Sequence, residues 1–268
     1  MNNSEVKEMK LNPEYGILIR LENPEFIEST WKKDEIYFSP LSIFKELEEI
    51  ENDMARGDKD EGSVDLAQDQ TTTIFVKTKN MQYPIPLRVK KAALGLKYPE
   101  RWGIACFFFF PFTKNCFKST FNENDNKTVL DFTDEVIKDF AKFQSEISEA
   151  GEQSKRQILV FSVPTIFTES VMSSKDFYIQ HDEIRYYDPL KSFDVMSEAN
   201  DDPLKLAFFK RDKYAYQHEY RIITELDGPD YKGKKLHFDH LSENMGIISD
   251  IDDLAKLSLI MPGKVELS

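Results

Sequence analysis

The chain has 268 residues, 40% of them hydrophobic, which is enough apolar material for one domain with a sizeable core. No apolar run reaches the about 20 residues that span a bilayer, the first residues lack the pattern of a secretory signal, and two cysteines give no disulfide framework, so we expect a soluble cytoplasmic protein without membrane contact. The net charge of -13 disfavours binding to a nucleic-acid backbone, which needs clustered lysine and arginine.

The first third of the chain mixes short strands with two helices. In chain order, the sequence predicts a strand over 15–21, a helical turn within 25–30, a strand over 35–39, a helix over 40–54, and strands over 71–77 and 85–89. Ser39 is a suitable N-cap for the longer helix, and Pro40 suits its first position. The segment 55–70 is charged and poor in large apolar residues, so we predict a polar loop there, with disorder as an alternative.

The remainder of the chain is also rich in strands. It predicts a strand over 103–110, a polar loop over 117–127, a helix over 132–147 capped by Asp131, a strand over 158–163, an extended segment over 176–187, a short helix over 203–209, a long strand over 213–226, and weaker strands over 233–238 and 258–261. The run 103–110 is apolar without alternation, which indicates a strand covered on both faces. Strands outnumber helices without regular alternation. This favours one α+β domain over 1–268, with a mainly antiparallel or mixed sheet.

The segment 214–223 carries the most informative polar residues. Side chains alternate between the two faces of a strand, so Gln217, Glu219 and Arg221 are expected on one face. On an exposed face, the last two would form an ion pair worth about 0–1 kcal/mol. In a site, the guanidinium would instead keep the carboxylate ionised and fixed in direction.

Gln217-x-Glu219 resembles the Q-x-E signature of one class of ADP-ribosyltransferases. The resemblance implies that Glu219 holds the nicotinamide ribose of NAD and stabilises an oxocarbenium-like transition state. It also implies that Gln217 orients the acceptor of the ADP-ribose group. From its place beside Glu219, Arg221 is expected to hold that carboxylate, as part of the cofactor-binding set.

Two earlier segments are similar to other parts of that class. Arg20, on the first predicted strand, resembles an arginine that binds NAD phosphate. Tyr37-Phe38-Ser39 resembles a second-strand serine that follows an aromatic residue. The similarity implies that Tyr37 packs against nicotinamide and that Ser39 supports the site. The class therefore implies an ADP-ribosyltransferase or NAD glycohydrolase that uses NAD as substrate, with a macromolecular acceptor.

A second resemblance covers more of the chain. The segments 17–20 and 35–40, followed by Phe44 and acidic residues, are similar to the opening of the bacterial family catalogued as domain of unknown function 2971. Lys210, followed by aromatic residues and by the segment 217–221, is similar to that family's closing segment. This similarity implies a bacterial or phage protein connected with phage defence.

Other patterns keep alternatives open. His237-x-x-His240 could chelate a metal, but no carboxylate or cysteine has an obvious place beside it, so no metal is predicted. The net charge and the acidic region 53–69 also fit a non-enzymatic inhibitor or nucleic-acid mimic that binds a basic protein. Convergence of Arg20, Ser39 and Glu219 in one pocket would favour the enzyme.

Overall fold

A computed structural model describes residues 9–12, 14–22, 24–51, 58, 60–66, 70–77, 82–89, 92–149, 157–161, 178–189, 202–227, 232–248, 253 and 256–268. Within these ranges the α-helices are α1 (Pro24–Lys33), α2 (Leu41–Glu51) and α3 (Asp134–Glu149). Strands make up most of the remaining structure, so the α+β class predicted from the sequence is confirmed. None of the described helices is long and apolar enough to cross a membrane.

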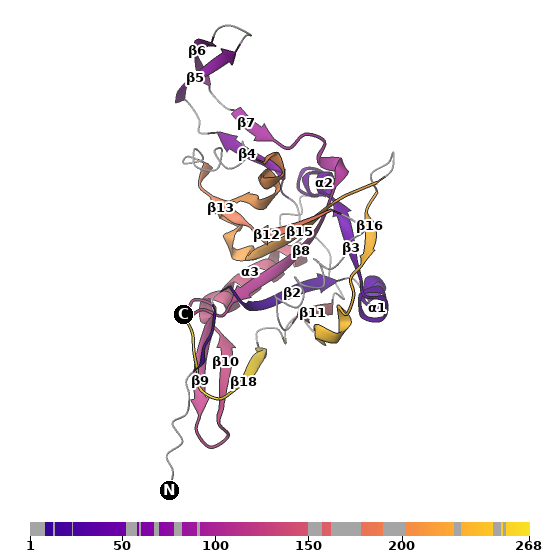
Figure 1. Ribbon diagram of the computed structural model, residues 1–268, viewed down its shortest axis with the longest axis vertical. Helices are drawn as coiled ribbons and strands as arrows, with labels where there is room; N and C mark the ends of the chain where they lie inside the picture. The colour runs from indigo at the N-terminus through magenta and orange to yellow at the C-terminus, as the bar shows by residue number, and fades with distance from the viewer. Residues whose placement is uncertain are drawn as a thin grey trace.

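The largest sheet is antiparallel throughout (Figure 1). Its order is β12 (Ile179–Glu183), β15 (Glu219–Glu225), β8 (Trp102–Pro111), β2 (Gly16–Glu22), β11 (Gln157–Phe161) and β17 (Met245–Ile248). Two further strands join it beside β2, where β3 (Glu35–Pro40) pairs with β8, and β16 (Lys234–His237) pairs with β3. Strand β8 therefore lies at the centre of the sheet.

Smaller sheets extend from this centre. They comprise β9 (Phe117–Asn122), β10 (Lys127–Phe132) and β18 (Ser258–Pro262), the antiparallel pairs β4 (Ser63–Leu66) with β7 (Ala92–Gly95) and β5 (Gln70–Lys77) with β6 (Gln82–Val89), and the parallel pairs β1 (Met9–Lys10) with β19 (Val265–Glu266) and β13 (Arg185–Tyr187) with β14 (Phe209–Arg211). Figure 1 places the β5–β6 hairpin at one end of the long axis and the β9–β10 hairpin at the other.

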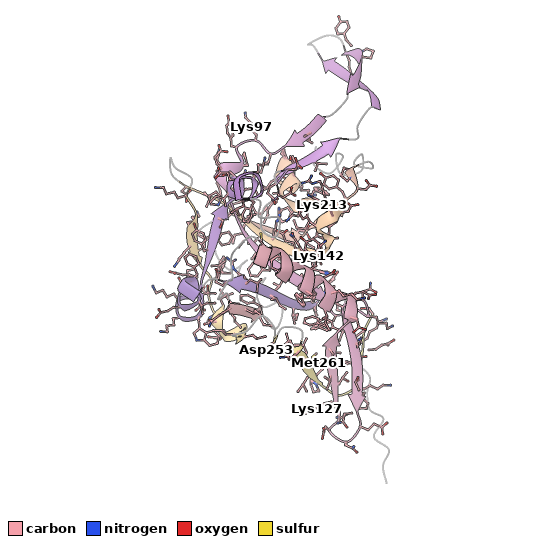
Figure 2. All side chains as sticks on the ribbon, turned by 180° about the vertical axis from the view of Figure 1, so that it is seen from behind. Lys97, Lys127, Lys142, Lys213, Asp253 and Met261 are labelled. Atoms are coloured by element: carbon pink, nitrogen blue, oxygen red, sulfur yellow. The ribbon has the colours of Figure 1, made fainter. Side chains whose placement is uncertain are left out.

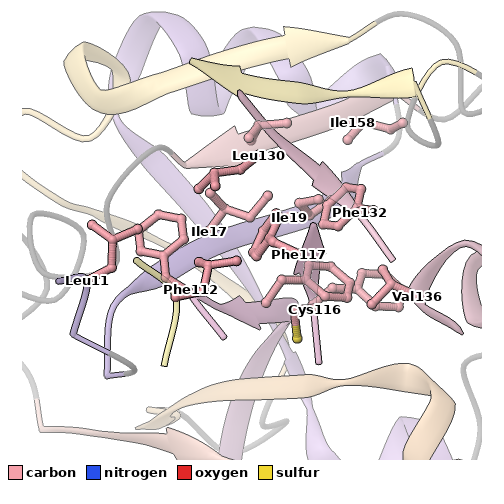
Figure 3. Packing of buried hydrophobic residues seen from close by; sticks show 14 of the residues in the cluster. Leu11, Ile17, Ile19, Phe112, Cys116, Phe117, Leu130, Phe132, Val136 and Ile158 are labelled. Carbon is pink, nitrogen blue, oxygen red and sulfur yellow. The ribbon is translucent and has the colours of Figure 1, made fainter. Parts of the chain in front are cut away.

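The core lies on both faces of β8, as its unbroken apolar run predicts. Phe108 and Phe110 point toward α3 and share a cluster with Ile17 and Ile19 of β2. Figure 3 shows part of this cluster, including Phe117, which packs with the two isoleucines. On the other face the cluster includes Leu18, Phe38, Phe107, Phe109, Phe161 and Phe238. The high phenylalanine content is thus used mainly to fill two apolar layers around one sheet.

Several predicted boundaries are wrong. Residues 117–132 form the β9–β10 hairpin, which includes the predicted loop 117–127, because cross-strand pairing stabilises its polar residues. Helix α3 begins at Asp134, and its cap is Thr133, whose hydroxyl accepts a bond from the Val136 amide at 3.4 Å, instead of Asp131. Helix α2 begins at Leu41, because Pro40 closes β3. The predicted end of that helix, at residues 52–54, lies outside the described residues.

The predicted strand 213–226 is also wrong in its first half. Residues Asp212–Gln217 form a 3-10 helix, η4, and His218 follows in the left-handed region with a φ of 43°. Strand β15 begins only at Glu219. Gln217 and Glu219 therefore do not lie on one strand face, and their relation depends on the turn at His218.

Candidate functional site

The site forms where two strands separate from β8. Strand β3 pairs with β8 at Gly103 and Ile104, whereas β2 pairs with β8 over 108–111. Residues 105–107 keep their partners on β15, and among the described residues they have no strand partner on the other side. Because β2 and β3 separate here, a slot is left between them, beside residues 105–107 of β8.

A pocket with a volume of about 370 Å³ opens at this slot. That volume lies within the range of small-molecule sites, about 300–1,000 Å³. Its lining comes from β2, β3, β8, α1, α2, α3, Lys210 and the segment 217–221: Arg20, Leu21, Glu22, Phe26, Tyr37, Ser39, Ile43, Phe44, Leu47, Ile104, Ala105, Cys106, Phe107, Phe108, Phe143, Lys210, Gln217, Glu219 and Arg221. Residues from both faces of β8 contribute, so the pocket extends into the slot.

Arg20 spans the slot between β2 and β3. Its Nη2 atom donates to the main-chain carbonyl of Tyr37 at 3.0 Å, and its Nε atom donates to Oε2 of Glu22 at 2.8 Å. The guanidinium also lies 5.3 Å from the ring centroid of Phe107. Its Nη1 atom is buried and has no hydrogen-bond partner in the described part of the chain. A buried unpaired donor is costly, so this atom is suited to an acceptor group of a ligand.

Aromatic rings form one wall of the pocket. Tyr37 and Phe26 stack with ring centroids 5.4 Å apart and planes at 2°. The Lys235 ammonium lies 5.3 Å from the Phe26 ring centroid on α1. Ser39 follows on the same side of β3 as Tyr37 and also lines the pocket. A flat aromatic wall beside polar groups is typical of a site for a planar ring.

Lys210 holds two oxygen atoms at the floor of the pocket. Its Nζ atom donates to Oε1 of Gln217 at 2.7 Å and to Oε2 of Glu219 at 3.0 Å, and it lies 4.9 Å from the ring centroid of Tyr214. The side chain of Lys210 is only 3% exposed. An ammonium can only donate, so it fixes the carbonyl side of the glutamine amide toward itself. This contact brings Gln217 and Glu219 together although a turn separates them.

Arg221 binds the other oxygen of Glu219. Its Nε atom donates to Oε1 at 2.6 Å, and the opposite edge of the guanidinium forms a bidentate pair with Glu61, with Nη2 donating to Oε2 at 3.0 Å. Its Nη1 atom also donates to the carbonyl oxygen of Ala207 at 2.6 Å. The side chains of Arg221 and Glu61 are each 1% exposed. The interpretation of Glu219 and Arg221 as an exposed surface pair is therefore wrong, because both are buried.

The main chain at Glu219 is held as firmly as its side chain. Its amide donates to the hydroxyl oxygen of Tyr186 at 2.8 Å, and its carbonyl accepts from the Ile184 amide at 2.8 Å. Directly before it, the His218 ring contacts Asp139 of α3 at 2.8 Å. Figure 2 shows α3 with Lys142 labelled, whose ammonium lies 3.7 Å from the ring centroid of Tyr216 in η4. These contacts fix the turn that orients the carboxylate.

The prediction of a polar loop over 55–70 is wrong for the described residues of that range. Ser63–Leu66 form β4, and the carboxylates of Asp58, Asp60 and Glu61 turn inward. Arg211 contacts Asp58 and Asp60, each at 2.7 Å. Burial becomes favourable here because arginine partners far along the chain neutralise the acids. Residues 55–57, 59 and 67–69 lie outside the described residues.

The buried charges determine the protonation of the pocket floor. Burial alone would raise the pKa of Glu219, but the charges of Arg221 and Lys210 outweigh it and hold that pKa well below its usual range. Burial opposes the charge on Lys210, yet Glu219 and Glu61 raise its pKa. The carboxylate is therefore ionised and the lysine protonated at neutral pH. A protonated lysine is not a nucleophile, which excludes Schiff-base chemistry at Lys210.

Cys106 reports on the same carboxylate. Its thiol lies close enough to Glu219 for each group to shift the pKa of the other. Burial and the negative charge of Glu219 both raise the pKa of this thiol well above its usual value. The thiolate is the reactive form, so the thiol is inert at neutral pH.

The structure brings all six predicted site residues to one pocket: Arg20, Tyr37, Ser39, Gln217, Glu219 and Arg221. Sequence reasoning missed Glu61, which belongs to the predicted loop, and gave no role to Lys210 beyond a family resemblance. In the sequence, the only signal for Glu61 is that an acidic residue precedes Gly62, and this is too weak to identify a buried residue. In the structure, Gly62 has a φ of 65°.

No family model, curated protein or solved structure matches this chain. The two family resemblances noted in the sequence therefore stay predictions.

The two histidines considered as metal ligands lie away from the pocket. His237 contacts the carbonyl oxygen of Lys33 at 2.7 Å, and His240 contacts Glu243 at 2.9 Å. Both side chains are exposed. Within the described ranges, no group of three histidine, cysteine or carboxylate residues could hold a metal ion.

Proposed function

We propose that the pocket binds NAD and that the protein cleaves the bond between nicotinamide and ribose, as an ADP-ribosyltransferase-like or NAD glycohydrolase-like enzyme. One observation carries this proposal. Arg20, Ser39 and Glu219, selected from separate parts of the sequence, line the same pocket. The first and the last of these residues are 199 positions apart in the chain, and the fold brings them to one site.

The chemistry needs a fixed negative charge beside the ribose. When the glycosidic bond breaks, its electron pair leaves with the ring nitrogen of nicotinamide, and positive charge develops on the ribose. The ionised carboxylate of Glu219 would stabilise that charge, because it is already oriented and needs no reorganisation. An acceptor hydroxyl, or water, then forms the new bond to the ribose carbon and releases its proton to solvent. Gln217 shares the ammonium of Lys210 with Glu219 and would orient the acceptor.

The remaining pocket residues fit other parts of the same substrate. The unpaired Nη1 of Arg20 is suited to a phosphate oxygen, and the Tyr37 ring to the flat face of nicotinamide. The lining carries three cations, Arg20, Lys210 and Arg221, against the two carboxylates Glu22 and Glu219. This excess of positive charge suits a ligand that carries phosphate groups.

Two measurements test the proposal on wild type and on Glu219→Gln. The first is titration with NAD, followed by heat flow. The second is release of nicotinamide over time. We expect wild type to bind NAD and release nicotinamide, and Glu219→Gln to bind without release. Glu225→Gln, at the far end of β15 and paired with Arg101 on the surface, is the matched control and should behave as wild type.

The alternative is an acidic protein that binds a basic partner without catalysis. Its motivation was the acidic region 53–69, yet the described carboxylates Asp58 and Glu61 face arginines inside the molecule. They add little to a negative surface. Absence of NAD binding and release by wild type would contradict the enzyme proposal and favour this alternative. A role in phage defence stays an expectation from the family resemblance.

A further inference from the structure

We propose that Glu61 is a positioning residue of the pocket, which fixes the direction and the charge balance of Glu219 by holding Arg221 from behind. The proposal rests on the proposed function in taking Glu219 as the catalytic carboxylate. It adds a residue that does not line the pocket and that comes from a segment with no predicted structure.

The guanidinium of Arg221 binds two carboxylates on different edges. Arg221 presents its Nε edge to Glu219 and its two terminal nitrogens to Glu61. A guanidinium is planar, so a bidentate partner on one edge fixes the orientation of the other edge. With Glu61 in place, Arg221 gives Glu219 a single N–H from the side. The second oxygen of Glu219 is left to Lys210 and to the pocket.

Glu61 also affects the net charge of the buried groups around Glu219. Two cations, Lys210 and Arg221, contact the single carboxylate of Glu219. Without a further carboxylate, the buried group would have a net positive charge, which opposes a cationic transition state. Burial raises the pKa of Glu61, but the bidentate pair with Arg221 works against that rise and favours the carboxylate. As a carboxylate, Glu61 brings the four groups to zero net charge. This leaves the negative charge of Glu219 available to the reacting ribose.

Glu61 comes from a part of the chain far from the strand that carries Glu219. It lies 160 residues before Arg221, in the short turn that precedes β4. A second clamp holds the same turn, in which Asp58 and Asp60 contact Arg211. Only the Glu61 clamp touches the ion pair of Glu219. The neighbouring clamp therefore offers a control with similar burial and a different partner.

Cys106 offers a readout that needs no enzymatic activity. Cys106 lines the pocket together with Glu219, Lys210 and Arg221. The charge of Glu219 acts on its thiol, and Arg221, Lys210 and the hydroxyl of Tyr186 are the other titratable groups around it. Alkylation of a cysteine follows its thiolate fraction, so the pH dependence of the rate reports the charge balance around Glu219. Trypsin cuts after Lys114 and separates the Cys106 peptide from the Cys116 peptide.

The experiment compares wild type, Glu61→Gln and Asp58→Asn by iodoacetamide labelling from pH 7 to 11, with peptides resolved by mass spectrometry. The wild-type rate should still rise with pH at the top of this range, because burial and Glu219 raise the pKa of Cys106 well above its usual value, so a lowered midpoint appears as a plateau within the range. Loss of the Glu61 charge lets Arg221 turn toward Glu219, so the midpoint pH for Cys106 labelling should fall. Labelling at a fixed pH below the midpoint should rise about tenfold for each unit of that fall. Asp58→Asn should keep the wild-type midpoint even if it unfolds at a lower temperature.

A purely structural role for Glu61 gives a different result. Local opening would raise the labelling rate at every pH without moving the midpoint, and Asp58→Asn would show the same effect. An unchanged midpoint in Glu61→Gln, with or without a higher rate, overturns the proposal.

The kinetic readout separates this proposal from the proposed function. If wild type releases nicotinamide, Glu61→Gln should lower kcat by about tenfold or more with a similar KM, because the residue acts on the transition state. A raised KM with unchanged kcat contradicts the positioning role. If wild type releases no nicotinamide, the proposed function fails, and the midpoint for Cys106 still decides whether Glu61 controls the charge at Glu219.

Discussion

The Nζ atom of Lys210 lies 3.0 Å from Oε2 of Glu219, and both side chains are buried. A buried cation beside a carboxylate stabilises the ionised form, whereas removal of either partner leaves an uncompensated charge. The ion pair that prepares Glu219 for catalysis thus also contributes to the stability of the fold. Substitutions here should change both catalysis and stability.

Glu219→Gln should lose nicotinamide release by about 100-fold or more, because the neutral amide cannot stabilise a developing positive charge. Lys210 would lose its counter-charge, so the free energy of unfolding should fall by about 1–3 kcal/mol. Steady-state kinetics and urea unfolding measure the two effects. Glu225→Gln, in the exposed pair with Arg101, should change the unfolding free energy by less than about 0.5 kcal/mol. Normal turnover in Glu219→Gln would exclude the carboxylate from the chemistry.

The stability difference between wild type and Glu219→Gln should depend on pH. The folded state holds the pKa of Glu219 well below its unfolded value of about 4.3, because Arg221 and Lys210 outweigh the effect of burial. A carboxyl with a lowered pKa contributes its full stability above the unfolded pKa and loses it as pH falls toward the folded pKa. The difference in Tm should therefore be constant from pH 7 to 5.5 and shrink from pH 5 to 3. A difference that grows on acidification contradicts the ion-pair geometry.

The prediction of the sheet from the sequence was correct where a segment is uniformly apolar. The unbroken apolar run of β8 indicated a strand covered on both faces, and both apolar layers are present. Sequence patterns gave wrong secondary structure where a segment is stabilised by contacts with residues on another strand. Residues 117–127 look like a polar loop because their stabilising contacts are the cross-strand pairs of the β9–β10 hairpin.

The same limit applies to the pocket. Alternation placed Glu219 and Arg221 on one strand face correctly, but it extended the strand through His218, whose left-handed backbone no pattern indicated. Gln217 reaches the pocket through its bond to Lys210 and not through strand geometry. The burial of Glu61 could not be predicted from the sequence, because an acidic residue in a polar segment is expected to face solvent. Only the structure shows its arginine partner.

Arg221→Met should be the most destabilising single change in the pocket. It leaves Glu61 and Glu219 buried beside each other without their shared cation, and breaking such a pair costs about 3–5 kcal/mol. Urea unfolding measures the loss. Arg101→Met, which breaks the exposed pair with Glu225, should cost only about 0–1 kcal/mol. Equal losses in the two variants would mean that the Arg221 cluster is open to water.

Gly233→Ala should disturb the aromatic wall from outside the pocket. A Cβ atom at Gly233 would lie 2.1 Å from the hydroxyl oxygen of Tyr37 and 2.7 Å from the carbonyl oxygen of Phe38, so the Tyr37 ring or the β3 backbone must move. We expect a loss of about 1–3 kcal/mol in unfolding free energy and weaker binding of NAD. Thermal unfolding and NAD titration measure the two effects.

The control for that substitution is Gly246→Ala on β17. The nearest atom to a Cβ there is the carbonyl oxygen of Val160 at 3.9 Å, an ordinary contact, so stability and NAD binding should stay close to wild type. If Gly233→Ala lost stability without weakening NAD binding, Tyr37 would belong to the fold and not to the ligand site. If it lost NAD binding together with stability, while Gly246→Ala kept both, the Tyr37 ring would form part of the surface that the ligand contacts.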